Sequence, residues 1–192
     1  MNILTVTTRK AWRSWLAKHH KTAADVWLVY HRKDSGKPRI AYDDAVLEAL
    51  CYGWIDSTVK KIDAERFAQR FSPRKPTSKL SQMNVERVRK LIAEKKMTKA
   101  GLAAIAHVYD PAKDAAEPLA VPPDILAAIK ADPAAWANFN KLPEAYKRIR
   151  ISYIDGRRRH GDDMFRRALN HFVTMTAKGK RIGFVKEWRN GD

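Results

Sequence analysis

Residues 42–75, with the sequence YDDAVLEALCYGWIDSTVKKIDAERFAQRFSPRK, form the stretch that decides the fold. Apolar side chains recur along its first part at the spacing of one face of an amphipathic helix: Tyr42, Ala45, Val46, Ala49 and Leu50. Gly53 follows where a helix of this length favours a residue with a left-handed backbone conformation. The pattern therefore predicts a helix over residues 42–52 that stops at this glycine.

The second half of the stretch is predicted to be an antiparallel β-hairpin. Residues 56–62 are rich in β-branched side chains, and over residues 66–72 two phenylalanines alternate with polar positions. The polar segment 63–65 joins the two runs, as in a hairpin connection of two or three residues. Pro73 and Pro76 then end the second strand, because proline cannot donate a hydrogen bond to a neighbouring strand.

The flanking segments predict the rest of an N-terminal α+β domain. Thr8 is placed to cap a helix that ends near His20, and residues 26–33 (VWLVYHRK) predict a short, largely apolar strand. Two further helices are predicted, one from about Ser78 and a shorter one from Thr98. We therefore expect an α+β fold that is mostly helical, with a small antiparallel sheet of about three strands and helices over one of its faces.

A proline-rich segment divides the chain. Residues 110–123 (DPAKDAAEPLAVPP) contain four prolines and no helical or strand periodicity, which is typical of a linker. Beyond it the pattern predicts helices only, and Asp132 with Pro133 forms a typical helix start. The sequence thus predicts an N-terminal α+β domain over residues 1–109, a linker over 110–123 and a C-terminal helical module over 124–192.

Basic side chains give the chain a formal net charge of +17, from 38 lysines and arginines against 21 aspartates and glutamates. The surplus is concentrated in two regions, because residues 57–100 carry a net charge of +9 and residues 141–192 carry +8. Such a charge favours an anionic partner, either a macromolecule such as nucleic acid, a phospholipid surface, or a phosphorylated or carboxylated ligand. The alternative is that these basic side chains lie on two solvent-exposed helical faces and bind no partner.

Cysteine usage and hydropathy predict where the protein works. A single cysteine, Cys51, excludes an internal disulfide framework and fits a reducing compartment. No window approaches the roughly 18 apolar residues that a membrane-spanning helix needs, and the first residues lack the apolar region of a signal peptide. We therefore expect a cytoplasmic protein without a transmembrane segment, and the sequence leaves its oligomeric state open.

No residue pattern predicts a metal, a cofactor or a catalytic centre. Cys51 lies in the last turn of the predicted helix, where the helix dipole raises the pKa of a thiol, so a core position is favoured over a nucleophile. The six histidines show no metal-ligand spacing, and the eight glycines form no phosphate-binding loop. Asp155, with Asp162 and Asp163, fits helix capping and surface ion pairs better than acid–base catalysis.

A binding site for an anion is predicted around the hairpin, from Asp56, Arg70, Arg74, Lys75 and Asn84. With a three-residue hairpin loop, Asp56 lies diagonally across from Arg70 and orients it toward an anion. Arg74 and Lys75 would hold that anion, and Asn84 would project from the following helix. With a two-residue loop, Asp56 lies instead on the face of the two phenylalanines and the pairing fails. The alternative is a structural ion pair beside a solvated basic loop.

Four segments combine in this chain: VWLVYHRK at 26–33, YDDAVLEALCYGWID at 42–56, RFSPRKPTSKLSQMN at 70–84 and ALNHFVTMTAKGKR at 168–181. Together they resemble the YdeI/OmpD-associated family, also called bacteriocin-protection proteins, over most of the chain from Trp12 to Arg181. The resemblance implies a bacterial protein of stress or bacteriocin tolerance. That tolerance describes a phenotype, so it does not name a reaction or a ligand.

Two positions depart from the pattern of that family. Ala41 stands where members often have Ser or Thr before the tyrosine, with Asp44 in place of a Glu. The helix then lacks a capping hydroxyl, which costs about 0.5–2 kcal/mol unless another group caps it. Leu80 stands where a tryptophan is usual, so a ligand site lined by that ring would not carry over to this chain.

Three functions follow from these features. The first is a non-enzymatic tolerance protein that binds an anionic partner. The second is a nucleic-acid-binding protein that contacts phosphates through arginines and bases through exposed aromatic rings; the candidate contacts are Arg157, Arg158, Arg159, Arg166 and Arg167. The third is an enzyme acting on a small anionic substrate, which the sequence favours least because it offers no paired nucleophile and base.

Overall fold

The computed structural model describes residues 2–114 and 119–183, and the chain divides into two compact units, residues 1–114 and 115–192. Each unit has its own hydrophobic core. The N-terminal unit combines a sheet with helices and the C-terminal unit is helical, which confirms the predicted α+β class. Within the described ranges, no helix has the length and apolar character that a membrane crossing requires.

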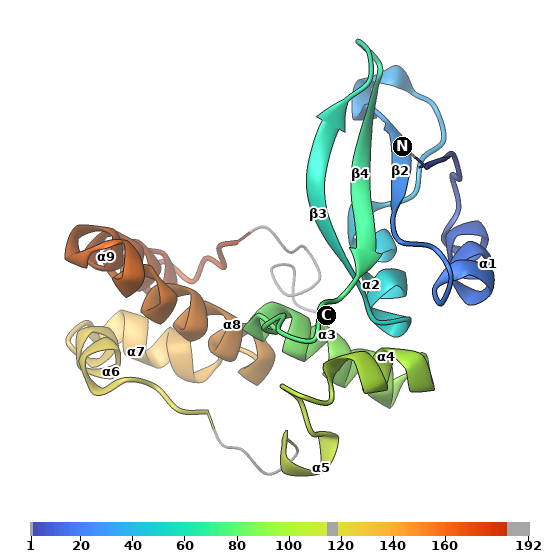
Figure 1. The fold of residues 1–192 in the computed structure, drawn as a ribbon. Coiled ribbons are helices and arrows are strands. Elements are labelled where there is room, and N and C mark those ends of the chain that lie inside the picture. Colours follow the sequence, from blue (N-terminus) through green and yellow to red (C-terminus); the bar gives the residue numbers. More distant parts are fainter. Residues whose placement is uncertain (1, 115–118, 184–192) are drawn as a thin grey trace. The chain divides into compact units, whose positions relative to one another are not determined.

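A four-stranded sheet forms the centre of the N-terminal unit (Figure 1), in the order β1 (Ile3–Leu4), β2 (Val26–His31), β4 (Arg66–Pro73) and β3 (Trp54–Lys61). The pairs β2–β4 and β4–β3 are antiparallel, whereas β1 runs parallel to β2. The expectation of about three strands was therefore wrong by one. A strand of two residues is too short to show an alternating pattern, so β1 leaves no periodic signal in the sequence.

Five α-helices accompany the sheet in the described part of this unit: α1 (Arg9–His19), α2 (Tyr42–Cys51), α3 (Gln82–Ala93), α4 (Lys99–Ile105) and α5 (Pro111–Asp114). Thr8, Ser81 and Thr98 cap α1, α3 and α4, since each side-chain oxygen accepts a hydrogen bond from a backbone N–H three residues on. The predicted strand 26–33 ends at His31, because a 3-10 turn, η1 (Lys33–Ser35), follows it.

The core of the N-terminal unit lies between one face of the sheet and helices α1 and α2. Alternate residues of β2 point into it, namely Val26, Leu28 and Tyr30, and they meet Trp12 of α1 and Leu50 of α2. All five side chains are at most 2% exposed. The indole N–H of Trp12 also donates to the backbone carbonyl of residue 45 at 3.0 Å, which ties α1 to α2.

The β3–β4 hairpin has the pairing of a three-residue loop near its loop and the pairing of a two-residue loop at its far end. Its loop has three residues, 63–65, since Ile62 donates a backbone hydrogen bond to Arg66. Near the loop Val59 lies opposite Gln69, as that loop length requires.

A β-bulge at residues 57 and 58 then shifts the pairing by one residue, so that Asp56 lies opposite Phe71. Because side chains alternate between the faces of a sheet, the shift moves Asp56 to the face of Phe71. That face is the one covered by α2, so the bulge sends a carboxylate toward the helix.

The C-terminal unit contains α6 (Pro123–Lys130), α7 (Pro133–Asn140), α8 (Glu144–Asp155), a 3-10 segment η2 (Gly156–His160) and α9 (Asp162–Ala177). Its core is formed by residues of all four α-helices, including Ile125, Phe139, Ile154 and Phe172. Asp132 caps α7 with Pro133 at the first helical position, as the sequence predicts. The division into residues 1–109, 110–123 and 124–192 stays a prediction, although Pro111–Asp114 of the expected linker are helical.

Candidate functional site

Arg74 lies directly after β4 and is the centre of the candidate site. Its backbone N–H donates to Gly53 at 2.9 Å, which fixes the end of β4 beside the end of α2. The side chain is 7% exposed, and its Nη2 donates to the Lys79 carbonyl at 2.8 Å. Its other two nitrogens, Nε and Nη1, are buried without a hydrogen-bond partner among the described residues. Burial lowers the pKa of the guanidinium, and the nearby Asp56 carboxylate offsets part of this effect.

A narrow cleft brings Arg74 together with Asp56 and Asn84. Apolar side chains of α2 and β3 form its remaining walls: Val46, Ala49, Leu50, Trp54 and Ile55. At its present width, a water molecule does not fit inside the cleft. Three of the five residues predicted to bind an anion therefore line one cleft.

The β-bulge places the Asp56 side chain in the cleft. Its Oδ2 accepts a hydrogen bond from the Tyr42 hydroxyl at 2.5 Å and a longer one from Gln69 Nε2 at 3.5 Å. The Tyr30 hydroxyl, close to the same carboxylate, is buried without a partner in the described chain. Desolvation, with smaller effects of Tyr42 and Asp56, raises the pKa of Tyr30 well above its ordinary value.

Asn84 enters the cleft from the first turn of α3. Its backbone N–H donates to the N-cap Ser81, and its Oδ1 accepts from Arg87 Nη1 at 3.3 Å. Arg87 is in turn held by Asp43 at 2.9 Å. The Asn84 side chain is thus oriented so that its amide Nδ2 donates to none of the described residues.

Arg70 and Lys75 lie outside the cleft, and the predicted pairing of Arg70 with Asp56 is wrong. Arg70 lies opposite Trp27 on the other face of the sheet, where its Nε donates to Asp25 at 2.8 Å. The one-residue shift at the bulge separates Arg70 from Asp56. Lys75 is exposed, and its backbone forms a turn with Ser78.

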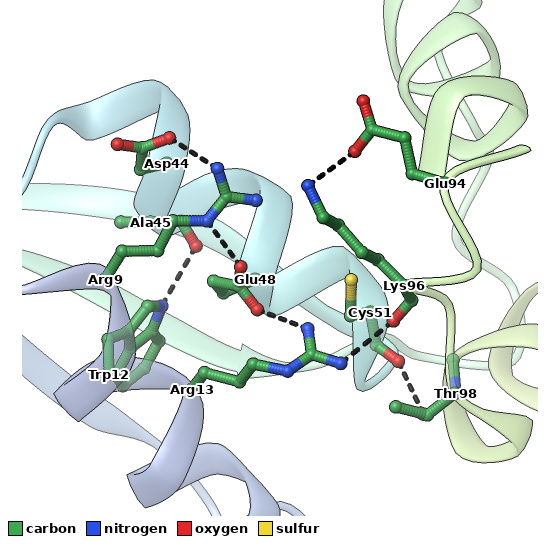
Figure 2. Close-up of polar contacts among 11 residues, drawn as sticks. Arg9, Trp12, Arg13, Asp44, Ala45, Glu48, Cys51, Glu94, Lys96 and Thr98 are labelled. Carbon is green, nitrogen blue, oxygen red and sulfur yellow. Dashed lines mark hydrogen bonds and ion pairs between the residues drawn. The ribbon is translucent and has the colours of Figure 1, made fainter. Parts of the chain in front are cut away.

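A second polar cluster, which the sequence did not predict, joins α1 to α2. Figure 2 shows Arg9 and Arg13 reaching the Glu48 carboxylate, with distances of 2.5 and 2.6 Å. Arg9 also pairs with Asp44 at 2.9 Å, and Glu48 is 2% exposed. A signal for this cluster was present in the sequence, since two arginines and two carboxylates each recur at a spacing of four residues.

Cys51 lies beside this cluster and is fully buried, as its predicted core position requires (Figure 2). Desolvation raises the pKa of the Cys51 thiol, and Arg13 offsets only part of that effect. Its backbone carbonyl accepts from the Thr98 hydroxyl at 2.5 Å. A buried thiol with a raised pKa forms little thiolate, so the geometry does not support Cys51 as a nucleophile.

The five arginines predicted to contact nucleic acid lie in η2 and α9: Arg157, Arg158, Arg159, Arg166 and Arg167. Three of them pair with carboxylates within 3.0 Å: Arg158 with Asp124, Arg166 with Asp162, and Arg167 with Asp163. The ring of Tyr153 is covered by the guanidinium groups of Arg150 and Arg157, at 4.6 and 4.4 Å. Paired arginines and a covered ring leave less charge and less ring surface for a nucleic acid.

An open polar hollow of about 370 Å³ lies at the tip of the hairpin, beside His31 and residues 63–66. Its charged groups pair with one another, Lys37 with Glu65 at 2.5 Å and Arg66 with Asp63 at 2.7 Å. Within the described ranges, no three histidine, cysteine or acidic side chains are grouped so that they could hold a metal ion. The Arg74 cleft is therefore the stronger candidate for a ligand.

Two family models match the chain. Residues 4–104 match a domain of unknown function (DUF8412), and residues 118–179 match the family described as bacteriocin-protection, YdeI or OmpD-associated. The resemblance to YdeI/OmpD-associated proteins is thus confirmed over the C-terminal match. Three of the four segments that carry the resemblance lie within the domain of unknown function instead. No curated protein and no solved structure matches the chain.

Proposed function

We propose that this chain, which belongs to the family of the domain of unknown function DUF8412, is a cytoplasmic protein of stress or bacteriocin tolerance. The bacteriocin-protection, YdeI or OmpD-associated domain over residues 118–179 supports the tolerance role. In this proposal the protein acts by binding an anion in the Arg74 cleft, without transforming it. The net charge of +17 supports an anionic partner over capture of a cationic peptide.

The observation that carries the proposal is the unpaired guanidinium of Arg74. Two of its three nitrogens are buried without a partner among the described residues, whereas most buried polar groups in proteins are hydrogen-bonded. A buried charge costs several kcal/mol unless it is paired. An anion in the cleft would supply the missing charge-assisted hydrogen bonds, which are about twice as strong as neutral ones.

Nucleic-acid binding finds less support from the structure. Arg74 is too deeply buried for a phosphodiester backbone to reach it, and three of the five predicted phosphate contacts pair with carboxylates. An enzymatic role also lacks a named nucleophile, since Cys51 is buried with a raised thiol pKa. Anion binding is the function that the geometry supports best.

Thermal and urea unfolding in a series of sodium salts at constant ionic strength test this proposal. A ligand at about 100 times its Kd stabilises the native state by about 2.7 kcal/mol, so one or more anions should raise the stability of the wild-type protein. Arg74→Met should abolish that dependence. Without added anion the variant should differ little in stability from wild type, because removal of a guanidinium with two unsatisfied nitrogens offsets the lost bond to the Lys79 carbonyl.

Arg70→Met is the matched control, because Arg70 lies on the other face of the sheet in a partly exposed pair with Asp25. It should cost only about 0–1 kcal/mol and leave the anion dependence unchanged. A wild-type protein whose stability is the same in every salt, together with a large loss of stability in Arg74→Met, would assign Arg74 to the scaffold. Survival of bacteriocin-treated bacteria that express wild type or Arg74→Met tests the link to tolerance.

A further inference from the structure

We infer that the ligand of the Arg74 cleft is a small monocarboxylate of about the size of acetate, and that Asp56 excludes dianions from it. This inference rests on the proposed function, since it names the chemical class of the anion. Four features carry it: the narrowness of the cleft, its free hydrogen-bond donors, its apolar walls and the carboxylate of Asp56.

The narrowness of the cleft favours a ligand of a few heavy atoms, because a small ligand requires the least opening. The space between its wall atoms does not admit a water molecule, so binding requires side chains of the wall to move apart. Arg74 belongs to the segment between β4 and α3, and within the described chain its side chain is held there by one hydrogen bond, from Nη2 to the Lys79 carbonyl. A nucleotide or a sugar phosphate would require a much wider opening.

The free donors of the cleft match a carboxylate. Arg74 offers Nε and Nη1, and Asn84 offers Nδ2, for which no acceptor exists among the described residues. A carboxylate has two oxygens that together accept about four hydrogen bonds, so it can accept from Asn84 Nδ2 and from either Nε or Nη1 of Arg74. Arginine is also the side chain that best fits the planar geometry of a carboxylate.

The apolar walls favour an organic anion over an inorganic one. Val46, Ala49, Leu50 and Trp54 offer only carbon surface to a bound molecule, apart from the Trp54 indole N–H, which already donates to the His20 carbonyl. A methyl group placed against these side chains is removed from water and is stabilised by the hydrophobic effect. Sulfate and phosphate present polar oxygens in every direction, and those facing the walls would lose their hydration without compensation.

The charge of Asp56 opposes a second negative charge. Arg74 and Asp56 are the charged side chains that line the cleft, and their formal charges cancel. Asn84, Tyr30 and Tyr42 are neutral, and Arg87 beyond Asn84 is paired with Asp43. A monoanion therefore meets one cation and one anion, whereas a dianion doubles the repulsion from Asp56 and its desolvation cost grows with the square of its charge.

Calorimetric titration of the full chain with sodium acetate, formate, sulfate and phosphate, at constant ionic strength, tests the inference. Acetate should bind about tenfold or more tightly than sulfate, because each like charge brought near Asp56 costs binding energy. Arg74→Met should lose acetate binding, and Arg70→Met should keep it. Asp56→Asn should narrow the preference for acetate over sulfate about fivefold or more, since the repelling charge is removed.

The outcomes separate the two proposals. The inference is overturned if sulfate or phosphate binds as tightly as acetate. If Arg74→Met then loses binding of all these anions, the proposed anion-binding function still holds. If no anion binds, or if Arg74→Met binds them all like wild type, the proposed function fails as well. Should Asp56→Asn fail to fold without its bond from Tyr42, the order of affinities in wild type decides the question alone.

Discussion

Two buried charges of the N-terminal unit show opposite arrangements. Glu48 accepts hydrogen bonds from two arginines, whereas Arg74 leaves two nitrogens without a partner in the described chain. Because an unpaired buried charge costs several kcal/mol, we assign the paired group to stability and the unpaired group to binding. The sequence alone could not separate them, since the partners of Glu48 lie 35 and 39 residues away along the chain.

Glu48→Gln is expected to destabilise the fold strongly. The substitution removes the carboxylate charge that Arg9 and Arg13 share at the α1–α2 contact, and a hydrogen bond to a charged group contributes about 1.5–3 kcal/mol. Urea unfolding followed by circular dichroism measures the change. Asp44→Asn is the control, because the partly exposed pair of Asp44 with Arg9 should contribute only about 0–1 kcal/mol. Equal, small losses in both variants would contradict the structural role of Glu48.

Tyr30→Phe is expected to change the dependence of stability on alkaline pH. Burial raises the pKa of the folded-state Tyr30 hydroxyl above its ordinary value of 10.0. A raised folded-state pKa gives stability that is fully present below the unfolded pKa and is lost as the pH rises above it. Wild type should therefore lose more stability than the variant above about pH 10. At pH 7 the variant should equal or exceed wild type, because it removes a buried hydroxyl without a partner.

Unfolding free energies measured at pH 7 and at pH 10.5 or above test this. Tyr109→Phe serves as a comparison, because the Tyr109 hydroxyl donates to Asp114 at 2.7 Å and its loss should already cost stability at pH 7. A marked loss at pH 7 in Tyr30→Phe would show that its hydroxyl has a partner in solution.

Secondary-structure elements with strong local signals could be predicted from the sequence, and their irregularities could not. The helix over residues 42–52 and the cap at Asp132 follow from periodicity and residue type, whereas the sequence left the hairpin loop open between two and three residues. The bulge at residues 57 and 58 has no comparable signal, because neither position carries a glycine and both suit a regular strand. Packing of the sheet against α2, a tertiary effect, decides which face Asp56 takes.

Helix α2 offers a test at the scale of a single element. It begins after Ala41, which makes no side-chain cap, although its backbone has the extended conformation that capping serine adopts. Ala41→Ser should therefore stabilise the protein by about 0.5–2 kcal/mol, measured as a rise in the urea midpoint with an unchanged slope. Ala41→Val, which adds bulk without an acceptor, is the control. No gain from serine would mean that another group already satisfies the first turn.

At the scale of the whole molecule, the sequence predicted part of the candidate site. Arg74, Asp56 and Asn84 meet in one cleft, as residues near the hairpin and the next helix were expected to do. Arg70 and Lys75 were misplaced because position in a basic stretch does not reveal which face of the sheet a side chain takes. The net charge pointed to an anionic partner, but the candidate site is a buried arginine and not the exposed basic surface.

The N-terminal unit is expected to end at Asp114 and to fold without the rest of the chain. The two units have separate hydrophobic cores, so residues 1–114 should fold alone and unfold in one cooperative transition. A fragment of residues 1–109, the boundary that the sequence predicts, should be less stable by about 2 kcal/mol. It lacks Asp114, whose carboxylate accepts from Arg89 at 2.5 Å and from the Tyr109 hydroxyl at 2.7 Å. Asp114→Asn in the longer fragment should reproduce most of the loss, and equal stability of the two fragments would place residues 110–114 in the linker.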